Sequence, residues 1–258
     1  MTDPSFASAQ PLSGRLALVT GAGQGNGRAL ALGLARAGAW VIVTDVNAET
    51  VAETARLVEQ QGGTAWADTL DVTSPEACKA LAARLADEVG SVDLLINNAG
   101  IIIREGSDSP NAEKNWRKTI DVNVHGTFNV THAFLPALKA TKGTIVNIAS
   151  IAAYAGQGGS LGYSPSKGAI KMLTQSWAVE LAKDGVRVNA LAPGVIETPM
   201  TTATRENAEK LEKFMTRIPM GRVGQPDELI GPVVFLASSM STYVTGVTLA
   251  VDGGFLAA

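Results

Sequence analysis

The sequence predicts an α/β fold: a doubly wound, parallel sheet of seven strands with helices on both faces, in a single domain. Short runs rich in valine, isoleucine and leucine alternate with longer stretches of helical pattern. This alternation is typical of βαβ units whose parallel sheet is covered on both faces. Right-handed crossovers between the strands then give the doubly wound arrangement. No repeat, low-complexity segment or proline-rich linker divides the 258 residues into smaller units.

The expected strands and helices follow one another along the whole chain. The strands are the apolar runs at 15–20, 40–45, 64–68, 92–97, 143–150, 186–193 and 247–253, and the helical patterns lie at 26–38, 47–61, 75–89, 113–140, 164–183 and 226–239. The stretch 196–222 has no strand pattern, so we expect a helical flap there, between the last two strands. Residues 1–13 lack a charged segment followed by an apolar core, and we expect a loose leader before a domain of 14–258.

Composition and charge exclude several classes of function. Hydrophobic residues make up 46% of the chain and charged residues 17%, an ordinary globular balance. The net charge is −3 and the pI about 5.5, so no basic surface points to nucleic acid or to an anionic membrane. No apolar run approaches the ~20 residues that a membrane span needs. The single cysteine, Cys78, excludes an internal disulfide, fits a reducing cytoplasm and is expected to be an inert helix residue.

No metal site is expected from the histidines. His125 and His132 are the only ones, and they would lie two turns apart on a helix. Neither has an adjacent cluster of carboxylate, histidine or cysteine ligands, so both are expected to be ordinary helix-surface or core residues.

A glycine-rich loop follows the first expected strand and opens the first expected helix. In TGAGQGNG, the glycines Gly21, Gly25 and Gly27 have the spacing G-x-x-x-G-x-G. Glycines permit a tight turn and let the backbone approach a pyrophosphate, while the N–H groups and dipole of a helix N-terminus favour anions. Because the loop lies between a strand and a helix, it predicts a dinucleotide site rather than an ordinary turn.

An acidic residue at the end of the second strand favours NAD over NADP. Asp45 lies about twenty residues after the glycines, where its carboxylate can accept hydrogen bonds from the ribose hydroxyls of the adenosine. A 2′-phosphate would meet a like charge there, no basic residue follows in DVNAET, and the loop itself has Gln24 rather than a basic residue. The alternative is that Asp45 only caps the next helix.

Polar or conformationally permissive residues follow the expected strands, where open parallel sheets bind ligands. In chain order they are Gly21, Asp45, Asp71, Asn97, Ser150 and Pro193. Each of them alone could be an ordinary turn residue. Together they predict a cleft along one edge of the sheet.

A tyrosine and a lysine four residues apart predict acid–base chemistry. In SLGYSPSKGAIK, Tyr163 and Lys167 would lie one turn apart on one helix face, and the helix can begin near Tyr163 because Pro165 is tolerated in a first turn. A nearby ammonium group and a bound NAD⁺ would lower the pKa of the phenol from about 10. Tyr163 could then act as a general acid/base near neutral pH. The alternative is a buried tyrosine beside a solvated lysine.

These motifs in combination resemble the short-chain dehydrogenase/reductase family, in its classical branch, over nearly the whole chain from Gly14. The matching segments are TGAGQGNG, DV at 71–72, NNAG at 97–100, Asn123, Ser150, YSPSK at 163–167, PG at 193–194 and VDGG at 251–254. One departure is Asn26, where the family usually has isoleucine or leucine packed under the loop. We expect it to alter the rigidity of the loop without removing a phosphate-binding glycine.

The resemblance implies a Rossmann-type domain and a role for each matching residue. The catalytic set would be Asn123, Ser150, Tyr163 and Lys167: Tyr163 takes the hydroxyl proton as hydride leaves for the nicotinamide, Ser150 orients the substrate oxygen, Lys167 holds the nicotinamide ribose and Asn123 holds a water that relays protons. Asp71 and Val72 would hold the adenine, and the segment from Pro193 to Thr198 the nicotinamide end. The expected cofactor-binding residues are Gly21, Gln24, Gly25, Asn26, Gly27, Asp45, Asp71, Val72, Asn98, Ala99, Gly100, Tyr163, Lys167, Pro193, Gly194, Ile196 and Thr198.

The substrate pocket is expected between the flap at 196–222 and the loop after NNAG. The segment NNAGIIIREGS and the C-terminal 28 residues are similar to those of sugar and sugar-acid dehydrogenases of the family. The expected function is therefore NAD-dependent interconversion of a secondary alcohol and a ketone on a sugar, polyol or sugar acid. Arg104 could pair with a substrate carboxylate, or it could be an ordinary surface arginine.

Two other functions are open at this point. β-Ketoacyl (acyl carrier protein) reductases share much of the same segments, but their reaction usually draws on NADPH, which Asp45 opposes. A non-catalytic dinucleotide-binding regulator should lack part of the serine, tyrosine and lysine set, which this chain retains. The resemblance also implies a homotetramer, with the long helices and the C-terminal strand region at its interfaces. The composition predicts a cytoplasmic location, with neither nucleic acid nor membrane as a partner.

Overall fold

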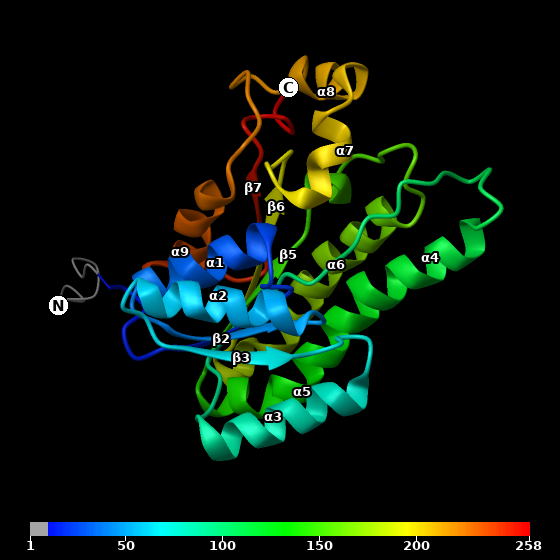
Figure 1. The fold of residues 1–258 in the computed structure, drawn as a ribbon. Helices are drawn as coiled ribbons and strands as arrows, with labels where there is room; N and C mark the ends of the chain where they lie inside the picture. Colours follow the sequence, from blue (N-terminus) through cyan, green and yellow to red (C-terminus); the bar gives the residue numbers. More distant parts are fainter. Residues whose placement is uncertain (1–9) are drawn as a thin grey trace.

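The computed structural model describes residues 10–258 and confirms the predicted fold class. Seven parallel strands form one sheet in the order β3-β2-β1-β4-β5-β6-β7 (Figure 1). They are β1 (Leu16–Thr20), β2 (Trp40–Asp45), β3 (Ala65–Thr69), β4 (Leu94–Asn97), β5 (Thr144–Ile148), β6 (Arg187–Pro193) and β7 (Thr248–Val251). The strand order reverses between β1 and β4. The crevice at the carboxyl ends of these two strands is where open α/β sheets bind ligands.

Helices cover both faces of the sheet (Figure 1). One face carries α1 (Gly25–Arg36), α2 (Ala48–Gln60) and α9 (Ile230–Ala237), and the other carries α3 (Pro75–Glu88), α5 (Gly126–Ala140) and α6 (Tyr163–Leu181). Each face buries its own apolar cluster: the first includes Leu34 and Val233, and the second includes Leu95 and Phe134. Because the strands are covered on both sides, their apolar runs are continuous rather than alternating.

The single long helix expected over 113–140 is interrupted. It consists of α4 (Ala112–Ile120) and α5, joined by a π-helical turn at Asp121–His125 that contains Asn123. A π turn holds one extra residue, which widens the helix, and such turns are frequent at functional sites. The residues before and after the π turn each keep the apolar period of a helix, so the sequence predicted one continuous helix.

The flap expected at 196–222 is built from short helical pieces. A turn at Pro199–Thr201 is followed by α7 (Thr202–Arg205) and α8 (Ala208–Met215). In Figure 1 this segment lies at the top, with the C-terminus beside α8. Phe255 is buried in a cluster with Ile151 and Ile218, and its ring lies 5.9 Å from that of Phe214. The end of the chain therefore anchors the C-terminal end of the flap.

The packed part of the chain begins earlier than expected. Leu12 is fully buried, and its N–H donates to the Ala37 carbonyl at 2.9 Å. A turn at Gly14, with φ of 78°, then leads into β1. The start of the domain at residue 14 was therefore wrong, because 10–13 pack against the core, and residues 1–9 of the expected leader lie outside the described residues.

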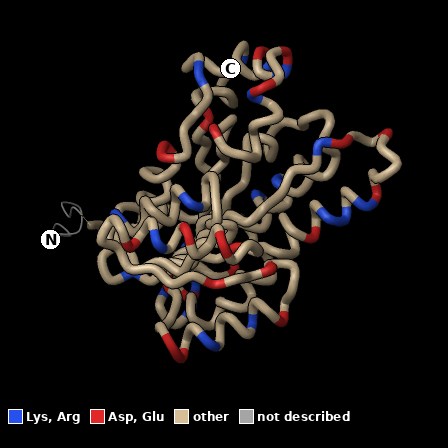
Figure 2. The backbone as a smooth tube through the Cα atoms, viewed as in Figure 1, with Lys and Arg blue, Asp and Glu red and all other residues tan. Residues whose placement is uncertain are grey.

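Charged side chains of both signs are distributed over the molecule. Figure 2 shows basic and acidic residues mixed on most elements in this view. No helix within residues 10–258 has the length and apolar character needed to cross a membrane. Cys78 is buried on α3, and burial raises the pKa of its thiol to about 11. The thiol is thus protonated and unreactive near neutral pH, as predicted.

Candidate active site

The loop between β1 and α1 has the geometry of a phosphate cradle. Gly21 and Gly25 have φ angles of 62° and 54°, in the left-handed region that favours glycine. A Cβ atom at Gly27 would lie 2.1 Å from the Gly21 carbonyl oxygen, so a side chain has no room there. No side chain caps α1, whose first N–H groups therefore remain for an anion.

Asn98 holds this loop from the neighbouring strand. Its Nδ2 donates to the carbonyl oxygens of Thr20 at 2.9 Å and of Gly21 at 3.0 Å. The Thr20 hydroxyl in turn accepts from the N–H groups of Asn98 and Ala99, both at 3.0 Å. The two segments that border the crevice, after β1 and after β4, are thereby locked together.

Asp45 holds the same loop from the other side. Its Oδ2 accepts from the Gly23 N–H at 3.1 Å. The helix-cap alternative for Asp45 is wrong, because Asn47 caps α2 by accepting from the N–H groups of Glu49 and Thr50. Asp45 is therefore a half-buried carboxylate at the mouth of the crevice, and it does not cap α2.

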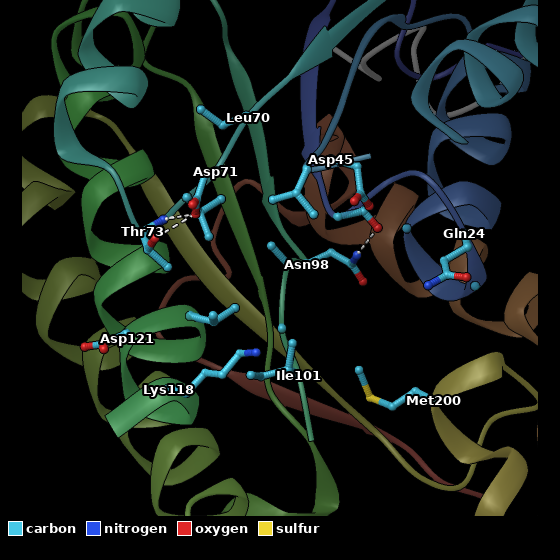
Figure 3. Close-up of a pocket in the computed structure, with 18 of the residues that line it drawn as sticks. Gln24, Asp45, Leu70, Asp71, Thr73, Asn98, Ile101, Lys118, Asp121 and Met200 are labelled. Carbon is cyan, nitrogen blue, oxygen red and sulfur yellow. Dashed lines mark hydrogen bonds between the residues drawn. The ribbon is translucent and has the colours of Figure 1, made fainter. Parts of the chain in front are cut away.

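The loop forms one wall of a cavity of about 1160 Å³ at the carboxyl edge of the sheet (Figure 3). The structure places most of the expected cofactor residues along it: Gly21, Gln24, Gly25, Asn26, Gly27, Asp45, Asp71, Val72, Asn98, Ala99, Gly100 and Thr198. Tyr163, Lys167, Pro193, Gly194 and Ile196 lie outside this lining. Of the six residues predicted to form a cleft at this edge, Gly21, Asp45 and Asp71 line the cavity, whereas Asn97, Ser150 and Pro193 do not.

The wall opposite the glycine loop comes from α4 and the π turn. Lys114, Lys118, Asp121 and His125 line the cavity, and Figure 3 shows Lys118 pointing into it near Ile101. The sequence reading missed these residues. Their spacing of four, three and four residues places them on one helix face, but spacing alone does not show which face turns toward the cavity.

The residues expected around the nicotinamide end differ in their exposure. Pro193 ends β6 and is buried, and a Cβ atom at Gly194 would lie 2.8 Å from the Cα of Asp252. Ile196 is only 3% exposed. Of this group, Thr198 is the one on the cavity wall, at the start of the flap.

Ser150, Tyr163 and Lys167 converge where β5 ends and α6 begins. Ser150 is buried and hydrogen bonds with the Tyr163 side chain. α6 begins at Tyr163 itself, so Lys167 lies one turn further along the same face, as predicted. Its Nζ donates to the Ile148 carbonyl at 2.7 Å and lies 5.8 Å from the centre of the Tyr163 ring.

The pKa of Tyr163 is shifted in the direction opposite to the one expected. Burial raises the pKa of the phenol, and the Ser150 hydrogen bond and the charge of Arg104 oppose this only in part. Lys167 is itself buried, which lowers the pKa of its ammonium group to about 8. The sequence placed the two groups correctly but could not show that Lys167 is buried and Tyr163 partly buried. The protein alone therefore keeps Tyr163 protonated near neutral pH.

We expect the buried Lys167 to make the stability of the protein rise with pH. Its folded-state pKa of about 8 lies below the ordinary value of 10.5, so below pH 8 the folded state holds a costly buried charge. This cost disappears as the pH rises toward the unfolded value, and it amounts to about 3 kcal/mol at ~1.4 kcal/mol per pH unit. Thermal unfolding of the wild type and Lys167→Met, at about pH 7.5 and pH 9.5, checks this. The wild type should gain stability relative to the variant, and parallel curves would contradict the expectation.

Asn123 fixes the loop after β4. Its Oδ1 accepts from the Ile101 N–H at 2.7 Å, and its Nδ2 donates to the Ile101 carbonyl at 3.0 Å and to the Ser166 hydroxyl at 2.9 Å. Both Nδ2 hydrogens are thus in use. The Asn123 carbonyl accepts from the Thr127 hydroxyl at 3.0 Å and keeps a second lone pair. A water held by Asn123 stays a prediction, and the backbone carbonyl is the group that could hold it.

Arg104 links the loop after β4 to the flap. Its Nη2 donates to the Met200 carbonyl at 2.9 Å. The guanidinium is solvent-exposed, yet its charge contributes to lowering the pKa of Tyr163. Arg104 therefore connects the loop to the flap and acts electrostatically on Tyr163.

Known proteins resemble this chain over nearly its full length. A family model described as enoyl-(acyl carrier protein) reductase matches residues 21–256. A 2-dehydro-3-deoxy-D-gluconate 5-dehydrogenase of Bacillus subtilis (strain 168) is 46% identical over 249 residues, which are 95% of this chain and 96% of that protein. A 3-oxoacyl-(acyl-carrier-protein) reductase of Thermotoga maritima is 39% identical over 246 residues, 95% and 99% of the two chains.

A solved structure supports the same relationship. A gluconate 5-dehydrogenase from Burkholderia cenocepacia J2315, in complex with NADP and tartrate, superposes with a TM-score of 0.92 at 38% identity. The superposition covers 97% of this chain and 98% of that one. At this identity and coverage, the shared fold extends over nearly the whole chain rather than the glycine loop alone.

Proposed function

The chain belongs to the short-chain dehydrogenase/reductase family, and on that premise we propose that it interconverts a secondary hydroxyl and a ketone on a sugar acid, with NAD as the hydride carrier. The observation that carries the proposal is the convergence of Ser150, Tyr163 and Lys167 beside a glycine-lined cavity. The sugar acid is favoured over a neutral polyol because two of the relatives described above are named for gluconate or a gluconate derivative.

The proposed chemistry divides between the cofactor and this chain. Bound NAD⁺ supplies the hydride acceptor. The Tyr163 oxygen takes the proton from the substrate hydroxyl as hydride leaves the same carbon, and the Ser150 hydroxyl holds the substrate oxygen. Burial keeps the pKa of Tyr163 high, so the phenolate needs positive charge close by. Charged Lys167 and the oxidised cofactor would provide it, and a water held by the carbonyl of Asn123 would relay the proton away from Tyr163.

The residues of the cavity fit a dinucleotide. The glycine cradle leaves no room for a side chain at Gly27, and the uncapped start of α1 offers N–H groups to phosphates. Asp45 is the basis for proposing NAD rather than NADP, because its carboxylate would repel a 2′-phosphate and accept from a ribose hydroxyl. The solved gluconate 5-dehydrogenase holds NADP, so the cofactor preference of this chain requires its own test.

Replacing Asp45 with alanine is expected to reduce the preference for NAD⁺. The affinity for NAD⁺ should fall about 10- to 100-fold, because a hydrogen bond to a charged group is lost, while NADP⁺ should bind better. Asp45→Asn is the matched control, since its amide oxygen can still accept from Gly23 and only the charge is removed. Kinetics with both cofactors measure the effect. A wild type that already prefers NADP⁺ would refute the NAD proposal and leave the substrate proposal standing.

The substrate class is tested by a panel of sugar acids, neutral polyols and short hydroxy acids, assayed by the absorbance of reduced nicotinamide with NAD⁺ and NADP⁺ in parallel. We expect sugar acids with a free secondary hydroxyl to give the highest kcat/KM. Acetoacetyl thioesters with NADH and NADPH belong in the same panel. Their preference would favour the alternative, a β-ketoacyl (acyl carrier protein) reductase, which the similarity to the Thermotoga maritima enzyme supports.

Arg104 is proposed to bind the carboxylate of the sugar acid. Its guanidinium lies at the flap, near Tyr163, and a planar fork of donors suits a carboxylate. Arg104→Ala should raise KM for a sugar acid by about 10- to 100-fold and leave KM for a neutral polyol nearly unchanged. Equal losses on both substrates would mean that Arg104 acts only by holding Met200. Arg104→Lys keeps the charge and should recover part of the loss.

We also propose a homotetramer located in the cytoplasm. Phe128 and Val179, on α5 and α6, are exposed apolar residues, as are Tyr243 and Leu249 near β7. These two faces belong to the long helices and the C-terminal strand region, where partner subunits are expected. Light scattering of the purified chain should give about four times its mass of 26.7 kDa.

A further inference from the structure

One end of the flap is anchored by a buried phenylalanine. Phe255 is 4% exposed and shares a buried cluster with Ile151 and Ile218. The centre of its ring lies 5.9 Å from the ring of Phe214 and 4.2 Å from the Arg217 guanidinium. An aromatic pair and a cation over a ring each add to the stabilisation that burial gives. Three residues of the flap thus pack on or around this single side chain.

The turn over 252–256, which carries Phe255, is itself held in shape. Its first residue, Asp252, accepts with its two carboxylate oxygens from the N–H groups of Gly254 and Leu256, at 2.9 Å each. Hydrogen bonds to an ionised group are stronger than those between neutral groups. The turn would lose both bonds if it swung away, so Phe255 is a fixed point on which the flap can rest.

Little else holds this part of the flap. All eight residues of α8, at the edge of the molecule in Figure 1, are at least partly exposed. Only partly buried side chains such as Phe214 pack on the cluster. The base of the flap is fixed separately, because the Glu197 N–H donates to the Gly224 carbonyl at 2.8 Å. Segments with few buried apolar contacts open locally at low cost, so the position of α8 depends on Phe255.

The flap connects this cluster to the candidate active site. Ile151, in the cluster, directly follows Ser150 of the candidate catalytic set. At the start of the flap, Met200 lines the cavity, and its carbonyl accepts from Arg104. The flap therefore runs from the cavity wall to the cluster around Phe255, and a change at the cluster alters the cover of the substrate pocket.

We propose that Phe255 is a positioning residue for the substrate, which holds α8 and the end of the flap against Ile151 and so keeps the substrate pocket covered. Phe255 lies outside the lining of the cavity, so it acts through the flap rather than by touching cofactor or substrate. The inference rests on the proposed function only in placing the substrate under the flap. If loss of the anchor left the flap in place a tenth of the time, the apparent affinity for substrate would fall about 10-fold.

The first test is kinetic and uses the best substrate of the panel described above. We expect Phe255→Ala to raise KM for this substrate about 10-fold and to leave kcat within about 3-fold, since bound substrate itself holds the flap in place at saturation. The dissociation constant of NADH should stay within about 3-fold, because the glycine loop packs in a different cluster. Phe255→Leu keeps an apolar side chain without the ring and should show a smaller rise in KM.

Limited digestion with trypsin reports on the flap without any substrate. Lys210, Lys213 and Arg217 provide cleavage sites on and beside α8. Cleavage there should be about 10-fold faster in Phe255→Ala, because the flap is released more often, and saturating substrate should slow it again. Phe134→Leu, a buried change in the separate cluster at α5, is the matched control. It should lower the unfolding midpoint and leave both KM and the cleavage rate of the flap unchanged.

The outcomes separate positioning from a merely structural role. A lower unfolding midpoint of Phe255→Ala with unchanged KM and unchanged cleavage would overturn the proposal, as would an equal rise in KM for NAD⁺ and for the substrate. If Phe255→Ala does not fold, Phe255→Leu decides between the same outcomes. A wild type that turns over no substrate of the panel would refute the proposed function, and the cleavage rates would still decide whether Phe255 anchors the flap.

Discussion

Replacing Tyr163 with phenylalanine is expected to lower kcat for alcohol oxidation by about 100- to 10,000-fold, the usual contribution of a general acid/base. The ring is retained, so packing at the start of α6 should not change. What is lost is the hydroxyl group that hydrogen bonds with Ser150 and would take the substrate proton. Affinity for NADH should stay within about 3-fold of the wild type, since no bond to the glycine loop involves this hydroxyl.

The chain offers a matched control for this variant in a second tyrosine and lysine pair. The Tyr154 ring lies 4.6 Å from the Lys171 ammonium, and its hydroxyl donates to the Thr248 carbonyl at 3.3 Å. Tyr154 is 46% exposed and does not line the cavity. Tyr154→Phe should therefore leave kcat within about 2-fold, because it loses one exposed hydrogen bond. If Tyr163→Phe also kept its kcat, Tyr163 would not be the general acid/base; a wild type without any turnover would instead indicate a dinucleotide-binding module.

The sequence was sufficient for the sheet and for the position of the cleft. Strands such as β1 are buried on both faces, so an unbroken apolar run marks them clearly. Gly21 and Gly25 adopt left-handed φ angles that glycine tolerates best, so the loop can be recognised in the sequence from the spacing of its glycines. Wherever a local conformation depends on the residue type itself, the sequence and the structure agree.

Features that depend on long-range packing could not be predicted. The π turn around Asn123 and the face of α4 that turns toward the cavity are set by how the long helix packs on its neighbours. Leu12 is held in place by the hydrogen bond of its N–H to the carbonyl of Ala37, a residue far along the chain. The raised pKa of Tyr163 has the same origin, since desolvation depends on everything that surrounds the phenol rather than on the residue one turn away.

Gly27→Ala is expected to weaken dinucleotide binding by about 10- to 100-fold, because even one methyl group forces the loop apart and such overpacking costs on the order of 1–3 kcal/mol. The new Cβ would lie 2.1 Å from the Gly21 carbonyl oxygen and 2.5 Å from Asn98 Nδ2. Neither atom can move freely: Gly21 is backbone in a left-handed turn, and the Asn98 amide is held by the carbonyl groups of that same turn. Relief of the clash must distort the phosphate cradle.

Gly231→Ala in α9 provides the control for this change. A Cβ atom there meets nothing within 4 Å apart from its chain neighbours, and because Pro232 follows, alanine should give no gain in stability and leave cofactor binding unchanged. Titration with NADH and thermal unfolding of both variants, side by side, separate loss of the cradle from general helix effects. If Gly27→Ala bound NADH as tightly as the wild type, the loop would not be the place where the pyrophosphate approaches the backbone. The cavity would then have to hold its ligand by the α4 wall, through Lys114 and Lys118, rather than by the start of α1.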